Sequence, residues 1–125
     1  MLFNSEKFTG ASGKQLDWKI DCDSLTQGDI DAIVKIAVPL LPTYHKVYGV
    51  PTGGLVLANA FQRCSWKTEY YTPKPFIVDD VWTTGYSMNK YVKEQGFEDW
   101  NGFVIFARGP LPPNVKCLFK LELGA

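Results

Sequence analysis

Two adjacent carboxylates, Asp79 and Asp80, follow an apolar run at residues 76–78 that has the character of a buried strand. A turn rich in hydroxyl groups and glycine comes next and leads into a predicted helix. It comprises Thr83, Thr84, Gly85, Tyr86 and Ser87. The N–H groups and dipole of a helix N-terminus, with nearby hydroxyls, suit a phosphate, and carboxylates accept hydrogen bonds from sugar hydroxyls. The segment therefore predicts a site for a phosphorylated sugar.

The predicted site requires both acids to reach the same ligand, which depends on the side of the sheet that each acid faces. Adjacent residues of a strand point to opposite faces. Asp79 and Asp80 are therefore expected to share a ligand only if the strand ends at them. An Asp-Asp pair alone is more often the polar end of a strand, whereas the succession of strand, acids and hydroxyl-rich turn is specific.

A second turn of the same kind lies at residues 49–54, with the sequence Gly-Val-Pro-Thr-Gly-Gly. Gly53 and Gly54 allow a ligand to approach the backbone closely, and their N–H groups suit a second phosphate or a pyrophosphate. Taken alone, the segment is explained equally well by a plain turn between strand and helix. Two such turns on one sheet predict a ligand with phosphate at both ends.

The elements around these turns alternate between strand and helix. Thr26 and Asp29 have the spacing of a capping box, and apolar residues at 30–38 repeat at helical spacing until Pro39 and Pro42 end the helix. The other predicted elements are strands near 17–21 and at 46–50, 69–72, 76–78, 102–107 and 116–123, and helices at 55–61 and 87–95. The alternation predicts a single α/β domain over residues 1–125, with a mainly parallel sheet flanked by helices. Such sheets bind ligands beyond the carboxyl ends of their strands.

The second predicted helix, at residues 55–61, follows the glycine turn directly. Leu55, Ala58 and Gln62 recur on successive turns and are expected to mark one face.

The composition excludes several classes of protein. The chain has 125 residues, 46% of them hydrophobic, which fits one folded domain and excludes a disordered chain. The 13 basic residues balance the 13 acidic ones, so a broad basic face for nucleic acid is not expected. Three cysteines at long spacings and a single histidine predict free thiols, with no disulfide framework or zinc site. No apolar run has the length of a signal peptide or membrane span, and we expect a cytoplasmic protein that binds neither nucleic acid nor membranes.

The two turns together resemble those of the type I phosphoribosyltransferases. Residues 76–87, an apolar strand followed by Asp-Asp-x-x-Thr-Thr-Gly-x-Ser, look like the family's motif for phosphoribosyl pyrophosphate (PRPP), and residues 49–54 look like its pyrophosphate loop. Within the family the chain is most similar to the orotate phosphoribosyltransferases, over most of its length. Residues 8–14 are similar to their N-terminal Phe-Thr-Leu-Lys-Ser-Gly-Arg stretch, residues 61–67 to the start of their mobile catalytic loop, and residues 104–108 to a strand ending in Asp-Arg.

The resemblance implies a role for each matching position and a reduced N-terminal hood over the core fold. Asp79 and Asp80 would hold the ribose hydroxyls of PRPP and help to place Mg²⁺. The hydroxyl-rich turn would bind the 5′-phosphate. The pyrophosphate would bind Thr52, Gly53 and Gly54.

The remaining implied roles concern the transfer itself. Arg63 and Lys67 would act with the two acids in catalysis by neutralising charge on the leaving pyrophosphate, and Arg108 would face the orotate. The implied reaction is Mg²⁺-assisted transfer of a phosphoribosyl group to a nucleobase in pyrimidine synthesis. The resemblance also implies a homodimer.

Several positions depart from the family's pattern. Ala11 replaces a lysine of the N-terminal stretch, Cys64 replaces a basic residue of the mobile loop, and Ala107 replaces the aspartate before Arg108. Only about a dozen residues separate Ala60 from Pro75, so the loop is very short. Two alternatives therefore stay open. One is a regulator that binds PRPP or a nucleotide without turnover, and the other is a phosphoribosyltransferase for another base.

Overall fold

The computed structural model describes residues 24–65 and 73–121, together with the backbone of four two-residue strands near the N-terminus. These strands are β1 (Phe3–Asn4), β2 (Phe8–Thr9), β3 (Gln15–Leu16) and β4 (Lys19–Ile20). β1 pairs with β4 and β2 with β3, both antiparallel. The strand expected near residues 17–21 falls on β4, and the strand expected at 69–72 lies outside the described residues.

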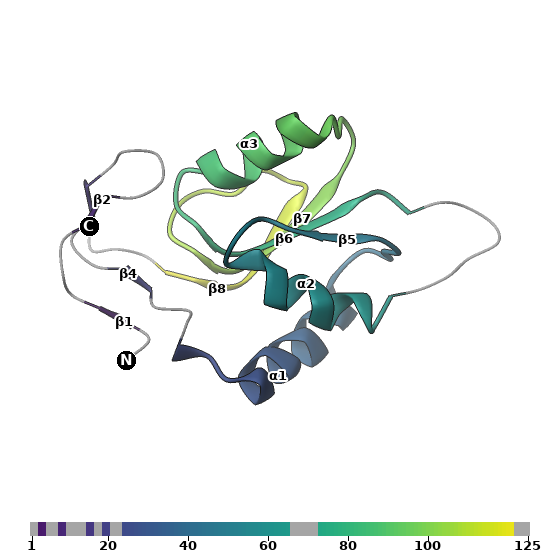
Figure 1. Ribbon diagram of the computed structural model, residues 1–125, viewed down its shortest axis with the longest axis horizontal. Coiled ribbons are helices and arrows are strands. Elements are labelled where there is room, and N and C mark those ends of the chain that lie inside the picture. The colour runs from purple at the N-terminus through teal and green to yellow at the C-terminus, as the bar shows by residue number, and fades with distance from the viewer. Residues whose placement is uncertain are drawn as a thin grey trace.

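The main sheet has four parallel strands in the order β5-β6-β7-β8. They are β5 (Val47–Gly49), β6 (Phe76–Trp82), β7 (Asn101–Ala107) and β8 (Val115–Lys120). Helices α1 (Gln27–Ala37) and α2 (Gly54–Gln62) cover one face, and α3 (Tyr86–Gln95) covers the other (Figure 1). The predicted α/β fold is confirmed. Because the strands are parallel, β5, β6 and β7 all end at one edge of the sheet, which we call the carboxyl edge.

The start of α1 is fixed by the predicted capping box. The Asp29 N–H donates to Thr26 Oγ1 at 3.1 Å, and the Thr26 N–H donates to Asp29 Oδ2 at 2.9 Å. These bonds satisfy two of the N–H groups that a helix N-terminus leaves without partners. The α-helix ends at Ala37 and continues as a short 3₁₀ turn, η2 (Val38–Leu40), that contains Pro39.

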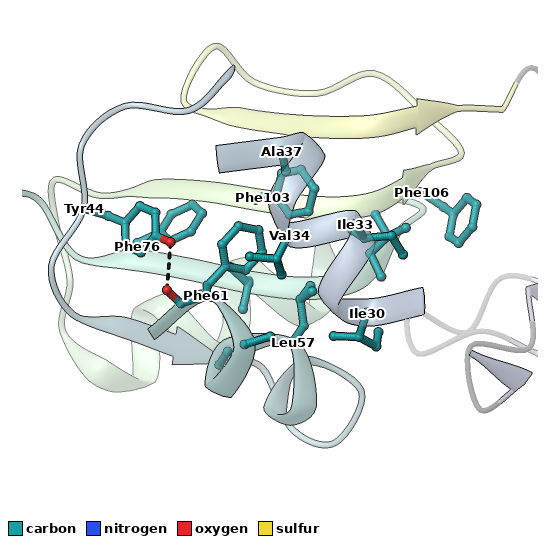
Figure 2. Close-up of a cluster of buried hydrophobic side chains, with 14 residues drawn as sticks. Ile30, Ile33, Val34, Ala37, Tyr44, Leu57, Phe61, Phe76, Phe103 and Phe106 are labelled. Atoms are coloured by element: carbon teal, nitrogen blue, oxygen red, sulfur yellow. Dashed lines mark hydrogen bonds between the residues drawn. The ribbon is translucent and has the colours of Figure 1, made fainter. Parts of the chain in front are cut away.

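The core between α1, α2 and the sheet is rich in aromatic rings. Phe61 of α2 lies edge-on to Phe76 and Phe103, with ring centroids 5.3 and 5.2 Å away. The Tyr44 hydroxyl donates to the Phe61 carbonyl at 2.7 Å, as Figure 2 shows. Tyr44 thereby ties the end of α2 to the chain that enters β5.

The face of α2 differs from the prediction. Leu57 and Phe61 are buried in this core, whereas the side chain expected to mark the face, Leu55, is 45% exposed. Ala58 is buried as expected. A helix with apolar residues on nearly every side offers no periodic signal for its orientation, so packing against α1 and the sheet decides it.

Of the three α-helices in the described part of the chain, only α3 covers the opposite face of the sheet. Met88 and Val92 of the helix are buried against Trp82 and Val104 of the sheet. Gly96 ends α3 in the left-handed conformation, at φ 76°, which a glycine adopts at little cost. Among the described residues, no helix combines the length and the apolar character needed to cross a membrane.

Candidate functional site

The two predicted acids lie within β6 and not at its end. β6 continues to Trp82, so the condition that the strand stop at the acids is not met. The alternation of sides reverses there instead. Ile77 belongs to the cluster under α3, yet Val81, four positions on, packs against the cluster under α1 and α2.

Local hydrogen bonds accompany this reversal. The Asp80 N–H donates to Asp79 Oδ1 at 2.8 Å, and the Val81 N–H donates to Asp80 Oδ1 at 2.8 Å. Neighbouring β7 shows the same reversal, since Ile105 and Phe106 both belong to the α1/α2 cluster. The strict alternation that would keep the acids apart therefore does not apply at this point of the sheet.

The carboxyl groups of Asp79 and Asp80 interact, and Asp79 is the more buried of the two. Asp79 is only 6% exposed. Its pKa is raised to about 9 by burial, by a side-chain hydrogen bond with Asp80 and by the negative charge of Asp80, in decreasing order. At neutral pH the buried Asp79 is therefore protonated.

The turn between β5 and α2, residues 50–53, packs directly against this pair. A side chain at Gly53 would overlap the Asp80 carboxylate, and one at Gly54 would overlap the carbonyl of Val78. The Val50 N–H also donates to the Val78 carbonyl, at 2.9 Å. The glycines predicted to approach a pyrophosphate, with Thr52 before them, thus lie beside Asp80.

The turn between β6 and α3, residues 83–85, follows the acids as predicted. Gly85 caps α3 at φ 83°, and among the described residues no side chain caps the first N–H groups of the helix. The indole of Trp82 lies under Gly85, where an added Cβ would overlap the ring. Tyr86 and Ser87 form the first turn of α3. The uncapped N–H groups and the helix dipole give this turn the character of an anion site.

Arg108 directly follows β7, at the start of the loop between β7 and β8 (residues 108–114). Its N–H donates to the Trp82 carbonyl at 2.7 Å, which fixes the start of the loop beside the β6–α3 turn. Burial lowers the pKa of Arg108, but a guanidinium keeps its charge in proteins. The structure therefore brings both turns, both acids and the backbone of Arg108 to the carboxyl edge.

Arg63 is not at this edge. α2 begins at Gly54 beside the acids and runs away from them for about 13 Å, at 1.5 Å per residue. At its far end the Gln62 side chain bonds to the backbone of His45 and Val47, where β5 begins. Arg63 pairs there with Asp31 of α1 at 3.0 Å, with both side chains well exposed. Lys67, the other cation predicted for catalysis, lies outside the described residues.

The fold of the chain is similar to that of solved structures. An orotate phosphoribosyltransferase from Aeropyrum pernix superposes with a TM-score of 0.68 and 20% identity, over 96% of this chain and 88% of that one. The Mycobacterium tuberculosis H37Rv enzyme, solved with Fe(III) dicitrate, gives 0.67 and 14%, over 97% and 90%. The Francisella tularensis enzyme gives 0.59 and 12%, over 95% and 80%. The fold is that of the orotate phosphoribosyltransferases. By sequence alone the chain matches no protein-family model and no curated protein.

Within this orotate phosphoribosyltransferase fold, two residues that the sequence reasoning did not place in the site take part in its geometry. The Trp82 side chain is buried, and its Nε1–H donates to the Pro110 carbonyl at 3.1 Å. Gly109 approaches the Thr83 carbonyl so closely that a Cβ would lie 2.6 Å from it. A glycine just after a predicted strand was the available signal for the second contact.

Proposed function

We propose that this protein transfers the phosphoribosyl group of PRPP to a nucleobase, with orotate as the first candidate. One observation supports the proposal most strongly: the Asp80 carboxylate lies against Gly53 of the β5–α2 turn. The strand that carries Asp80, β6, leads directly through the β6–α3 turn to the start of α3. A carboxylate that can accept hydrogen bonds from hydroxyl groups therefore lies between two turns suited to anions. PRPP has the matching order of groups, with ribose hydroxyls between a 5′-phosphate and a pyrophosphate.

The proposed reaction forms a bond from a base nitrogen to the anomeric carbon and breaks the bond from that carbon to pyrophosphate. Pyrophosphate leaves with the electron pair, through an oxocarbenium-like transition state. The protein has to position the two reactants, stabilise the leaving charge and exclude water. The N–H groups of Thr52 and Gly53 would stabilise the charge on the pyrophosphate, since the Gly54 N–H donates to the Val50 carbonyl at 2.8 Å, and Arg108 would bind the base.

The two carboxyl groups have different roles in this proposal. Asp80 would accept hydrogen bonds from the ribose hydroxyls, and protonated Asp79 would hold Asp80 in place through the side-chain hydrogen bond between them. The turn of Thr83, Thr84, Gly85, Tyr86 and Ser87 would bind the 5′-phosphate.

The acid pair also fits the Mg²⁺ that this reaction implies. The described residues contain no group of three or more metal-ligating side chains, so a cage made wholly of them is not expected there. Mg²⁺ is commonly held by one or two carboxylates together with substrate phosphates and water. Asp80 would supply one such carboxylate, because Asp79 is protonated at neutral pH, and the bound ion would neutralise charge on the pyrophosphate.

A PRPP-binding regulator without turnover is the second candidate. It is favoured by the position of Arg63, which pairs with Asp31 far from the acids. A phosphoribosyltransferase for a base other than orotate is the third, because Ala107 stands where the family's pattern has an aspartate. Both alternatives keep the PRPP site. The regulator would lack the transfer step, and the third candidate would accept a different base.

Two assays on the full chain separate these candidates. Calorimetry with PRPP and Mg²⁺ measures binding, and release of pyrophosphate with a panel of pyrimidine and purine bases measures turnover. Turnover with orotate supports the first proposal, and turnover with another base alone supports the third. Binding without turnover on any base supports the regulator. An absence of PRPP binding would contradict all three candidates. The control variant is Asp99→Asn, because Asp99 is an exposed acid far from the site.

A further inference from the structure

Trp82 connects the two parts of the site that the proposed function assigns to the phosphate and to the base. Toward the β6–α3 turn, its ring fills the space beneath Gly85, the residue that caps α3. Toward the β7–β8 loop, its Nε1–H donates to the Pro110 carbonyl at 3.1 Å, and its own carbonyl accepts the Arg108 N–H at 2.7 Å. The side chain is nearly completely buried between these contacts.

A further contact joins the β6–α3 turn to the β7–β8 loop without involving Trp82. Gly109 lies directly against the Thr83 carbonyl, so a displacement of the turn at that position would press on the loop. Leu111 of the loop also packs against the cluster to which Trp82 belongs. The turn and the loop therefore cannot shift independently, because close-packed contacts transmit small displacements.

We propose that Trp82 is a positioning residue that couples the β6–α3 turn to the β7–β8 loop, so that a phosphate bound in the turn orders the loop that carries Arg108. The inference rests on the proposed function for its ligand and goes beyond it in assigning a coupling between the two halves of the site. A phosphate bound in the β6–α3 turn holds Gly85 over the indole ring of Trp82, and the indole N–H holds the carbonyl of Pro110. The base would then meet a loop ordered in advance, which makes PRPP binding favour base binding.

The test uses ribose 5-phosphate as the probe and backbone amide hydrogen exchange as the readout. In the parent chain, saturating ribose 5-phosphate is expected to slow exchange at Arg108 and Gly109 about threefold or more. In Trp82→Phe, which lacks the indole N–H and the outer ring, ribose 5-phosphate should still bind but leave exchange at both amides unchanged. Trp100→Phe removes an indole from the same apolar cluster and should behave as the parent does.

The outcomes separate coupling from a merely structural role. Exchange at the Leu57 and Phe61 amides on the opposite face reports general loosening of the fold, and it should differ by less than about twofold between the two variants. Equal slowing at Arg108 in the parent and in Trp82→Phe would overturn the inference. Binding to the parent with no slowing would overturn it as well, and this measurement needs no variant to fold.

Failure of the proposed function gives a different result. If ribose 5-phosphate does not bind to the parent chain, the phosphate site is contradicted. The coupling is then judged without ligand: Trp82→Phe should speed exchange at both Gly85 and Arg108 by about tenfold relative to Trp100→Phe. Faster exchange at only one of the two amides would show that Trp82 does not connect the turn to the loop.

Discussion

Replacing Asp79 with asparagine should stabilise the protein at neutral pH. The folded chain holds Asp79 in its protonated form, because its pKa is raised from 3.8 to about 9. Unfolding lets this acid ionise at neutral pH, which favours the unfolded state. Asparagine has no such proton to lose. Its Oδ1 can accept the Asp80 N–H as the acid does, and its amide can donate to the Asp80 carboxylate as the protonated acid does.

The size of the effect can be worked out from the pKa. Stability falls as pH rises from the unfolded pKa of 3.8 toward the folded value, by up to about 1.4 kcal/mol per pH unit. Neutral pH lies about three units above the unfolded pKa, which gives an upper limit of about 4 kcal/mol. We expect Asp79→Asn to gain about 2–4 kcal/mol at pH 7, and a gain of 2 kcal/mol raises the Tm by about 8 °C.

The assay is thermal unfolding at a series of pH values. The difference in Tm between Asp79→Asn and the parent should be near zero at about pH 4, grow through neutral pH and level off at about pH 9. Asp99→Asn, at an exposed acid, is the matched control and should show no such trend. A destabilised Asp79→Asn variant at pH 7, or a difference in Tm that does not depend on pH, would refute the assignment of the proton to Asp79.

Three other predictions concern the ligand and the assembly. Asp80→Asn should weaken binding of PRPP with Mg²⁺ by about 10- to 150-fold in calorimetry, since a hydrogen bond to a charged group contributes about 1.5–3 kcal/mol; unchanged affinity would exclude Asp80 from the site. Arg63→Ala should leave PRPP affinity unchanged and cost less than about 1 kcal/mol in denaturant unfolding, because its exposed pair with Asp31 contributes little. A loss of affinity would show that Arg63 reaches a bound ligand. Sedimentation at micromolar concentration should show a homodimer, and a stable species of the chain mass, 14.1 kDa, would contradict it.

Much of the fold could be predicted because local signals and the global arrangement agree. The capping box of Thr26 and Asp29 marks the start of α1, and the apolar run before Asp79 marks a buried strand. The left-handed cap at Gly96 reflects the conformations open to glycine. The orientation of α2 could not be predicted, because nearly all of its residues are apolar and only tertiary packing buries Leu57 in place of Leu55.

The site was predictable in its parts but not in their geometry. Period-two alternation places Asp79 and Asp80 on opposite faces, and only the local hydrogen bonds of their carboxylates show where that alternation reverses. The position of Arg63 depends on the length and direction of α2, which carry it to the opposite edge of the sheet. The bond from Trp82 to Pro110 joins residues far apart in the sequence, and no sequence pattern announces it.

The most direct test is a crystal structure of the full chain with PRPP and Mg²⁺. We predict the 5′-phosphate within about 3 Å of the N–H groups at the start of α3, the ribose hydroxyls on Asp80, and the pyrophosphate along residues 52–54. Electron density for PRPP away from the carboxyl edge, such as beside Arg63 at the far end of α2, would contradict it. So would a ribose at that edge whose hydroxyls make no contact with Asp80.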